Sequence, residues 1–204
     1  MKKVINHLLA LSCLAIVFSA CKKETKEAVQ DEVSPSVLAQ IKALRFNEKG
    51  TQKIPEGYLV EGDIVLSESD LTDATQSPEM IIANEEHYRT TRLVNPTSYP
   101  TIRVRLASSS SSHNAVFTAA LDEAIARYNA QNLRIRFQRV SSGHHITVEA
   151  YYAVSNTLGS AGFPTSSGAP YNRVRMNNYW YSTSTTTTNR NYIATIMVHE
   201  LGHC

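Results

Sequence analysis

The chain has 204 residues, of which 42% are hydrophobic and 19% are charged, and this composition excludes a collagen, a coiled coil and a wholly disordered chain. Its 20 basic and 18 acidic residues give a formal net charge of +2, which is too even to indicate a nucleic-acid partner. The length allows one sizeable core with a smaller unit beside it.

Residues 1–20 have the pattern of a secretion signal. Lys2 and Lys3 precede an apolar run from Leu8 to Phe18 that is too short to cross a bilayer as a mature helix. Ser19 and Ala20 then lead directly into Cys21, so the segment resembles a bacterial lipoprotein signal, in which the cysteine becomes the lipid-modified N-terminus. The alternative is an ordinary signal in which Cys21 is incidental.

Lipidation at Cys21 would make the mature protein formally neutral. Removing Lys2 and Lys3 from the 20 basic residues leaves 18, equal to the 18 acidic residues. Residues 21–34 are charged and nearly free of large apolar side chains, so we expect a solvated, disordered tether. These features predict an exported bacterial lipoprotein of the outer membrane or cell surface, attached to the membrane through its lipid.

Residues 35–95 are expected to form a small α/β unit. Apolar residues recur at helical spacing from Val37 to Phe46, and Ser34 or Ser36 can cap the start of this helix. A strand-like run follows between Gly57 and Ser67. A unit of this size is at the lower limit of independent stability.

Residues 96–204 predict a larger domain of α/β or α+β class. Alternating residues predict strands at 101–106, 133–137 and 146–152, and a shorter strand at 174–176. A helix after the serine run at 108–112 should bury one face, and the final helix should start near Thr188 or Asn189. The buried face of the first helix is expected to contain Phe117, Ala120, Leu121, Ala124, Ile125 and Tyr128.

The final helix carries the pattern HExxH at residues 199–203. Residues four apart share a helix face, so His199 and His203 can bind one Zn²⁺ while Glu200 reaches a water on that ion. Zinc would activate this water and polarise a scissile carbonyl, with Glu200 as the general base. The pattern therefore predicts hydrolysis of peptide bonds in a peptide or protein substrate.

The residues VHELGHC (Val198 to Cys204), LGSAGFP (Leu158 to Pro164) and RVRMN (Arg173 to Asn177) resemble the HEIGH-type subgroup of the metzincin zinc peptidases, the M57 family. Leu201 stands where the subgroup has isoleucine. The resemblance covers roughly residues 97–204 and implies a twisted mixed sheet of four or five strands with two helices, the active-site helix being the last. It also implies an edge strand above the cleft along which extended substrates bind. We expect that strand at Leu158, Gly159, Ser160, Ala161, Gly162 and Phe163.

The same resemblance places a third histidine ligand at position 209, after a glycine at position 206. Both positions lie beyond Cys204, so we expect the sequence to be a fragment with a truncated catalytic domain and little or no proteolytic activity of its own. Cys204 should point about 100° away from His203 on the helix, and a disulfide to a cysteine beyond the fragment is expected in preference to a zinc bond.

Val60-Glu61-Gly62-Asp63-Ile64 resembles the prosegment motif of astacins, a sister metzincin family, in which an aspartate after glycine binds the zinc and displaces its water. By this resemblance Asp63 would keep the enzyme latent until the chain is cut between Glu85 and Pro96, which would also release it from the lipid. Val60 departs from the motif, which has an aromatic residue there. The alternative is an ordinary hairpin turn, because Gly-Asp is common turn chemistry.

Two other functions compete with the peptidase. One is a surface lipoprotein that binds a ligand and has a decayed HExxH motif, and the other is a domain with a structural zinc. The remaining histidines lack ligand spacing and are expected to be solvated or capping residues: His87, His113, His144 and His145. The sequence contains no signal for an oligomeric state.

Overall fold

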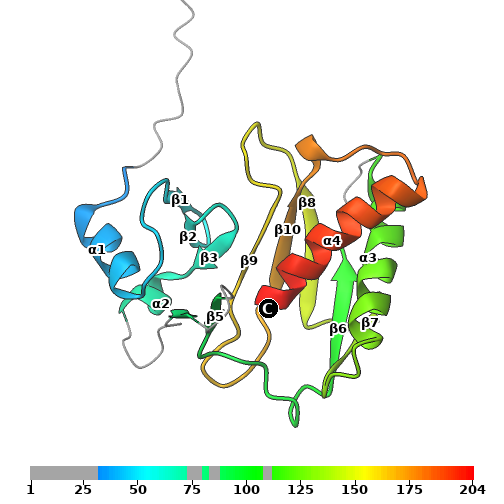
Figure 1. Cartoon of the computed structure of the whole chain (residues 1–204), viewed down its shortest axis with the longest axis horizontal. Helices are drawn as coiled ribbons and strands as arrows, with labels where there is room; N and C mark the ends of the chain where they lie inside the picture. Colours follow the sequence, from blue (N-terminus) through cyan, green and yellow to red (C-terminus); the bar gives the residue numbers. More distant parts are fainter. Residues whose placement is uncertain (1–31, 73–79, 83–87, 108–111) are drawn as a thin grey trace, which may run out of the picture.

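The computed structural model describes residues 32–72, 80–82, 88–107 and 112–204 (Figure 1). The expected signal peptide, the lipidation site Cys21, most of the tether and His87 lie outside the described residues. None of the described helices is both long and apolar enough to cross a membrane.

The N-terminal part forms a compact group of short elements. Pro35 occupies the first turn of helix α1, and the Ser34 hydroxyl accepts a hydrogen bond from the Val37 amide at 3.4 Å, so Ser34 is the predicted cap. The strand-like run is divided by a turn into two strands. The elements are α1 (Pro35–Ala43), β1 (Gln52–Ile54), β2 (Gly57–Val60), β3 (Ile64–Leu66) and α2 (Glu68–Thr72).

A separate antiparallel pair connects this group to the rest of the chain; it consists of β4 (Met80–Ile82) and β5 (Tyr88–Thr90). The second part then contains β6 (Thr101–Leu106), α3 (Asn114–Asn129), β7 (Arg136–Arg139), β8 (Ile146–Tyr151), β9 (Gly159–Gly162), β10 (Arg173–Asn177), a 3₁₀ turn (Asn178–Trp180) and α4 (Thr187–His203).

One eight-stranded mixed sheet runs through both parts, in the order β1-β2-β3-β9-β10-β8-β6-β7. Strands β6, β7, β8 and β10 pair in parallel, and β9 pairs antiparallel to β10. The five strands from β6 to β10, with α3 and α4, are the predicted twisted mixed sheet. Strands β1 to β3 extend that sheet because β3 pairs in parallel with β9.

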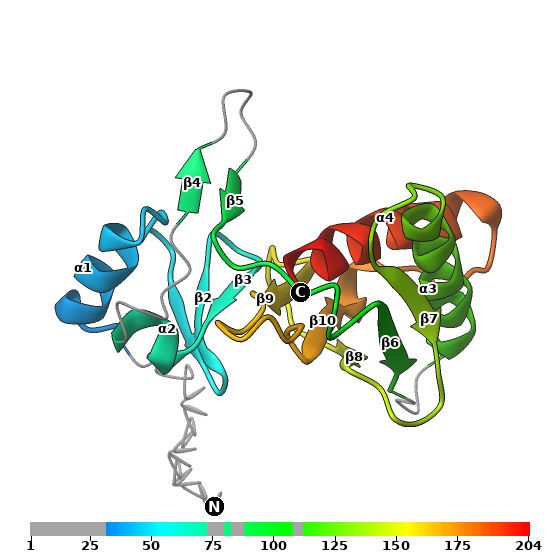
Figure 2. The same cartoon turned by 90° about the horizontal axis from the view of Figure 1, so that it is seen from below.

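Both long helices lie on the same side of the sheet (Figure 2). Between them and the strands lies the main core, in which the predicted face of α3 is buried at Phe117, Ala120, Leu121, Ala124 and Ile125. On the sheet side of this core, alternate residues of the strands point toward the helices: Ile102, Val104, Phe137, Ile146, Val148, Val174 and Met176. The core therefore fixes which face of α4 turns inward.

Two strand predictions extended too far. Leu133 is the first residue of the strand predicted at 133–137, but it is exposed because β7 begins only at Arg136. Tyr152 is also exposed, because β8 ends at Tyr151 and the ring of Tyr152 packs instead against that of Tyr179 at 5.7 Å. In both places apolar alternation continues past the residues that pair with a neighbouring strand.

Candidate metal centre

The two histidines of the HExxH pattern lie side by side on the last turn of α4. Their Nε2 atoms are 3.2 Å apart and their ring centroids 4.8 Å apart. Residues on the opposite face of the helix are buried in the main core, among them Met197 and Leu201, so the imidazoles are directed away from it. Helix periodicity and core packing together produce this pair.

The third group at this place is Asp63, in the turn between β2 and β3. Its Oδ2 accepts a hydrogen bond from His199 Nε2 at 2.8 Å and lies 3.8 Å from His203 Nε2. Glu61 and Gly62 have φ values of 54° and 93°, so the turn uses the left-handed region that glycine adopts readily. Asp63 is thus both a turn residue and a neighbour of the histidines. The hairpin turn and the latency contact, which the sequence left as alternatives, are therefore compatible.

The backbone of the turn at Asp63 is hydrogen-bonded to β9, the strand with which β3 pairs. The carbonyl of Asp63 accepts a hydrogen bond from the Ala161 amide of β9 at 2.9 Å, where the parallel pairing of β3 with β9 begins. This bond holds the aspartate over the end of α4.

These three side chains suit a zinc ion. Two imidazole nitrogens and one carboxylate oxygen are typical zinc ligands, and the three donor atoms lie within 4.8 Å of one another. Nitrogens bound tetrahedrally to one zinc would be about 3.3 Å apart. The 3.2 Å between the histidine nitrogens matches that spacing.

The charges at the site are strongly coupled. Burial acts to raise the pKa of Asp63, but the hydrogen bonds from His199 and His203 outweigh it and hold that pKa well below its usual value. The hydrogen bond to Asp63 in turn raises the pKa of His199. The aspartate is therefore ionised beside the histidines at neutral pH.

Glu200 lies beneath the pair and is 1% exposed. Its Oε2 atom is buried and has no hydrogen-bond partner among the described residues. Burial, and secondarily the charge of Asp63, raises the pKa of Glu200 to about 9. In this arrangement burial favours the neutral form of the carboxyl group.

The carboxyl group of Glu200 packs directly on Gly159 in β9. A methyl group at that glycine would lie 2.7 Å from Glu200 Oε1, closer than atoms can approach. The sequence offered no signal for this contact, because nothing in a local pattern relates β9 to α4.

The strand predicted as the free edge of the sheet is not an edge in this structure. β9 lies between β10 and β3, because the N-terminal part supplies β3 on its open side. Phe163, just after β9, stacks on Phe46 of the N-terminal part, with ring centroids 5.9 Å apart. Its ring also meets that of His203, with centroids 5.8 Å apart. Of the residues expected to pair with a substrate, Ala161 and Gly162 are thus paired with β3.

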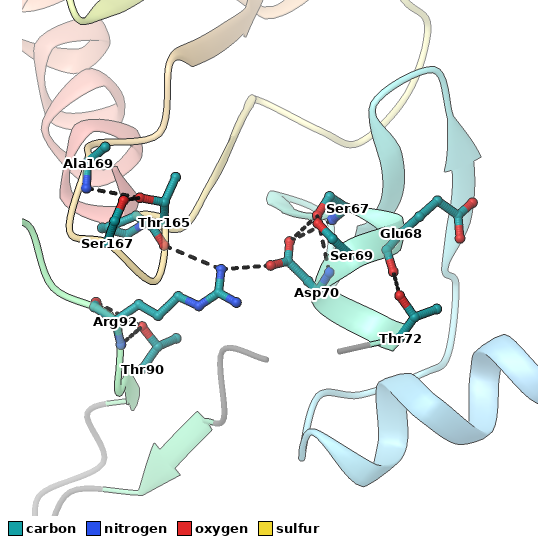
Figure 3. A network of polar contacts seen from close by, with 11 residues as sticks. Ser67, Glu68, Ser69, Asp70, Thr72, Thr90, Arg92, Thr165, Ser167 and Ala169 are labelled. Atoms are coloured by element: carbon teal, nitrogen blue, oxygen red, sulfur yellow. Dashed lines mark hydrogen bonds and ion pairs between the residues drawn. The ribbon is translucent and has the colours of Figure 1, made fainter. Parts of the chain in front are cut away.

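Two further anchors were missed by the sequence patterns. The guanidinium of Arg92 lies between Asp70 Oδ1, at 2.8 Å, and the Pro164 carbonyl, at 3.4 Å (Figure 3). Arg92 therefore joins the connecting segment to both the N-terminal part and the loop after β9. Asp70 is in turn held by the amide and hydroxyl of Ser67, at 2.8 and 2.7 Å.

The other anchor is Asn177, which is fully buried at the end of β10. Its amide group donates to the carbonyls of Ala153 and Thr157 and accepts from the Ala153 amide, all within 3.0 Å. These bonds fix the loop that leads into β9. That loop borders a cleft of about 400 Å³, which also contains Asp63, His199 and Glu200.

The remaining candidates lie away from the metal centre. His113 Nε2 bonds to the Tyr181 carbonyl at 2.8 Å, and His145 Nδ1 accepts from the Arg103 amide at 3.1 Å. Cys204 is buried in the main core, where its thiol contacts the Glu200 carbonyl at 3.5 Å. Burial raises the pKa of this thiol, so it is a poor zinc ligand here.

A family model described as the dual-action HEIGH metallo-peptidase, Peptidase M57, matches residues 58–204. The match covers more than half of the chain, and the chain therefore belongs to this family of metallopeptidases. The match begins in β2, so it includes the turn with Asp63 as well as the HExxH helix.

Among proteins with curated functions, none matches the chain significantly. Solved structures that match include that of myroilysin, at 20% sequence identity and a TM-score of 0.35. That match covers 50% of this chain and 46% of myroilysin, so the chain spans less than half the length of that protein.

Proposed function

We propose that this member of the M57 family is the latent form of a zinc endopeptidase, silenced by its own N-terminal part. The observation that carries the proposal is the position of Asp63, whose carboxylate lies 2.8 Å from His199 in the HExxH helix. His199 and His203 would hold the zinc, and Asp63 would occupy the position that catalysis needs for water.

Zinc held by these side chains would supply a Lewis acid that polarises the scissile carbonyl. Glu200 would act as the general base, taking a proton from the attacking water and returning it to the leaving amine. Withdrawal of Asp63 removes a nearby negative charge that helps to raise the pKa of Glu200, so Glu200 would ionise more easily after activation.

The pairing of β3 with β9 supports a second element of latency. An extended substrate would gain affinity by adding a strand to β9, between Leu158 and Phe163. Strand β3 pairs there through Ile64 and Val65, and Phe46 covers Phe163. The N-terminal part would therefore have to leave before a substrate strand could bind.

Activation would follow a cut in the segment from Glu85 to Pro96. The same cut would separate the catalytic part from the lipid on Cys21 and release it from the membrane of the exporting bacterium. The ion pair of Arg92 with Asp70 and the pairing of β3 with β9 would remain after the cut, so both contacts would have to open before the N-terminal part leaves.

The test is to express the full-length protein, cut it by limited proteolysis in this segment, and assay cleavage of a fluorogenic peptide library. We expect cleavage to appear after the cut, to stop with a chelator, and to return with zinc. Equal activity before and after the cut would contradict latency, and activity that resists chelation would contradict the role of zinc.

A further inference from the structure

Five arginines lie on the side of the large sheet that faces away from α3 and α4. Ile102 and Val104 of β6 are buried on the helix side, so Arg103 between them and Arg105 after them point to the other side, by the alternation of side chains along a strand. The cross-strand register extends this face to β7 and β10. We call it the arginine face: Arg103, Arg105, Arg136, Arg173 and Arg175.

The arginine face is a local concentration of charge in a chain with nearly equal numbers of acids and bases. Within the described strands, its one acidic neighbour on the same side is Glu149 of β8. Glu149 Oε1 lies 3.6 Å from Arg173 Nε and 3.7 Å from Arg175 Nε, so a single carboxylate is shared by two guanidinium groups. The remaining positive charge is not balanced from within the sheet.

A second carboxylate reaches the face from the N-terminal part. Glu56, in the turn between β1 and β2, places Oε1 2.5 Å from Arg173 Nη1 and Oε2 3.9 Å from Arg175 Nη1. The Glu56 side chain is 19% exposed, so it is largely covered at this contact. The face thus already contacts a carboxylate that another stretch of this chain presents.

Further hydrogen-bonding capacity at the face is unused. The Nε atoms of Arg105 and Arg175 are buried and have no hydrogen-bond partner among the described residues. A polar hollow of about 370 Å³ beside them is lined by Arg105, Arg173, Glu149 and His144, among others. Glu56 Oε2 is likewise buried without a hydrogen-bond partner, so the acids of the chain do not use all the donors of the face. Guanidinium groups that line the hollow can bind a further carboxylate.

The spacing of the arginines matches an extended peptide. Arg173 and Arg175 are two residues apart on one strand, as are Arg103 and Arg105, so each pair is separated by about 7 Å along the strand. Alternate side chains of an extended peptide have the same separation. Two carboxylates two residues apart could therefore pair with two arginines at once.

We propose that the arginine face is a docking surface for an acidic, extended polypeptide segment, and that Glu56 occupies part of it until the N-terminal part leaves. This inference rests on the proposed function, because in the bacterium the arginine face would be exposed when the N-terminal part is removed. On the activated peptidase such a surface would recruit substrate proteins that carry acidic stretches outside the bond that is cut.

Binding can be tested without any proteolytic activity. A fluorescein-labelled peptide of alternating glutamate and alanine is titrated into the full chain at low and at high salt, and anisotropy is measured. We expect weak binding by the unaltered chain and about fivefold tighter binding by Glu56→Gln, which frees Arg173. Glu48→Gln, which removes the same charge from a half-buried residue of the N-terminal part that pairs with Lys42, should leave the affinity unchanged.

The arginines are tested in the Glu56→Gln background. Arg173→Gln with Arg175→Gln should weaken binding about tenfold and reduce its salt dependence. Arg139→Gln with Arg190→Gln removes the same charge from residues that pair with acids of α3, and should have little effect. Thermal melting confirms that each variant is folded.

Equal affinity of the unaltered chain and Glu56→Gln would overturn the proposal, as would equal loss in the two arginine double variants. Tighter binding of a heparin fragment of the same charge, with the same dependence on Arg173 and Arg175, would assign the face to an acidic carbohydrate instead. Because the readout is binding, an absence of peptidase activity would refute only the proposed function.

Discussion

The carboxylate of Asp63 lies 2.8 Å from the imidazole of His199, although 136 positions separate the two residues. The contact joins a tight turn in the N-terminal part to the helix that carries the HExxH pattern. It also places an ionised group against both candidate zinc ligands, because the hydrogen bonds hold the pKa of Asp63 well below its usual value.

Replacement of Asp63 tests the latency contact. We expect Asp63→Ala to raise peptidase activity of the uncut, full-length protein by about tenfold or more, because the closed form loses its bond to the metal centre. Initial rates with a fluorogenic peptide measure the change. Asp122→Ala, which removes a surface carboxylate paired with Arg139, is the matched control and should leave the rate unchanged. Unchanged activity of Asp63→Ala would exclude the switch.

Replacement of Glu200 separates proton transfer from metal binding. In the activated protein Glu200→Gln should lower kcat by about 10² to 10⁴, the usual contribution of a general base, while zinc remains bound. Metal analysis of the purified variant and kcat for one peptide are the two measurements. Retained turnover would assign the general base to another residue. If the variant also lost zinc, its low kcat would report loss of the metal and not of the base.

Activity should be as sensitive to replacement of Gly159 as to replacement of Glu200, the proposed general base. A Cβ atom there would lie 2.7 Å from Glu200 Oε1, so Gly159→Ala must displace that carboxyl group. We expect a loss of about 10² in kcat with zinc content unchanged, because small misplacements of catalytic groups have effects of this size. Ser160→Ala, at the next position of β9, should retain most of the activity.

Zinc binding should depend on all three neighbouring side chains in the latent chain. His199→Ala or His203→Ala is expected to weaken zinc affinity by at least about 100-fold, and Asp63→Ala by a smaller factor. Competition with a chromophoric chelator measures the affinities, and His144→Ala provides the control. If Asp63→Ala binds zinc as tightly as the unaltered chain, Asp63 is not a ligand.

The stability of the metal-free chain should decrease as pH rises above about 5. Glu200 has its pKa raised from 4.5 to about 9, so its contribution is fully present below pH 4.5 and is lost as pH rises through 9. The raised pKa of His199 acts in the same direction, whereas the lowered pKa of Asp63 matters only below about pH 4. Melting temperatures of chelator-treated protein should therefore fall between pH 5 and 9.

Glu200→Gln should flatten this fall, because a glutamine does not titrate. Glu149→Gln, on the opposite side of the sheet, should keep the slope of the unaltered chain. A melting temperature that does not change with pH, or the same slope in Glu200→Gln, would show that Glu200 does not titrate in this way.

Local pattern predicted the elements that depend on local interactions. The 3.6-residue period of α3 gave its buried face from Phe117 to Ile125, and the spacing in HExxH placed His199 and His203 on one side of α4. Capping chemistry narrowed the start of α1 to Ser34 or Ser36, of which Ser34 is the cap. Each depends on residues within one or two helical turns, so the sequence alone determines them.

Tertiary structure decided the relations between elements that are distant in the chain. The register of β3 against β9 removes the free edge, brings Asp63 to the histidines and places Phe46 on Phe163. Strand pairing and side-chain packing across such separations leave no periodic trace in the sequence. The sequence alone thus determined a helix with two histidines on one side and, through a motif resemblance, singled out Asp63, whereas only the fold brought that aspartate and a strand of the same chain onto the helix.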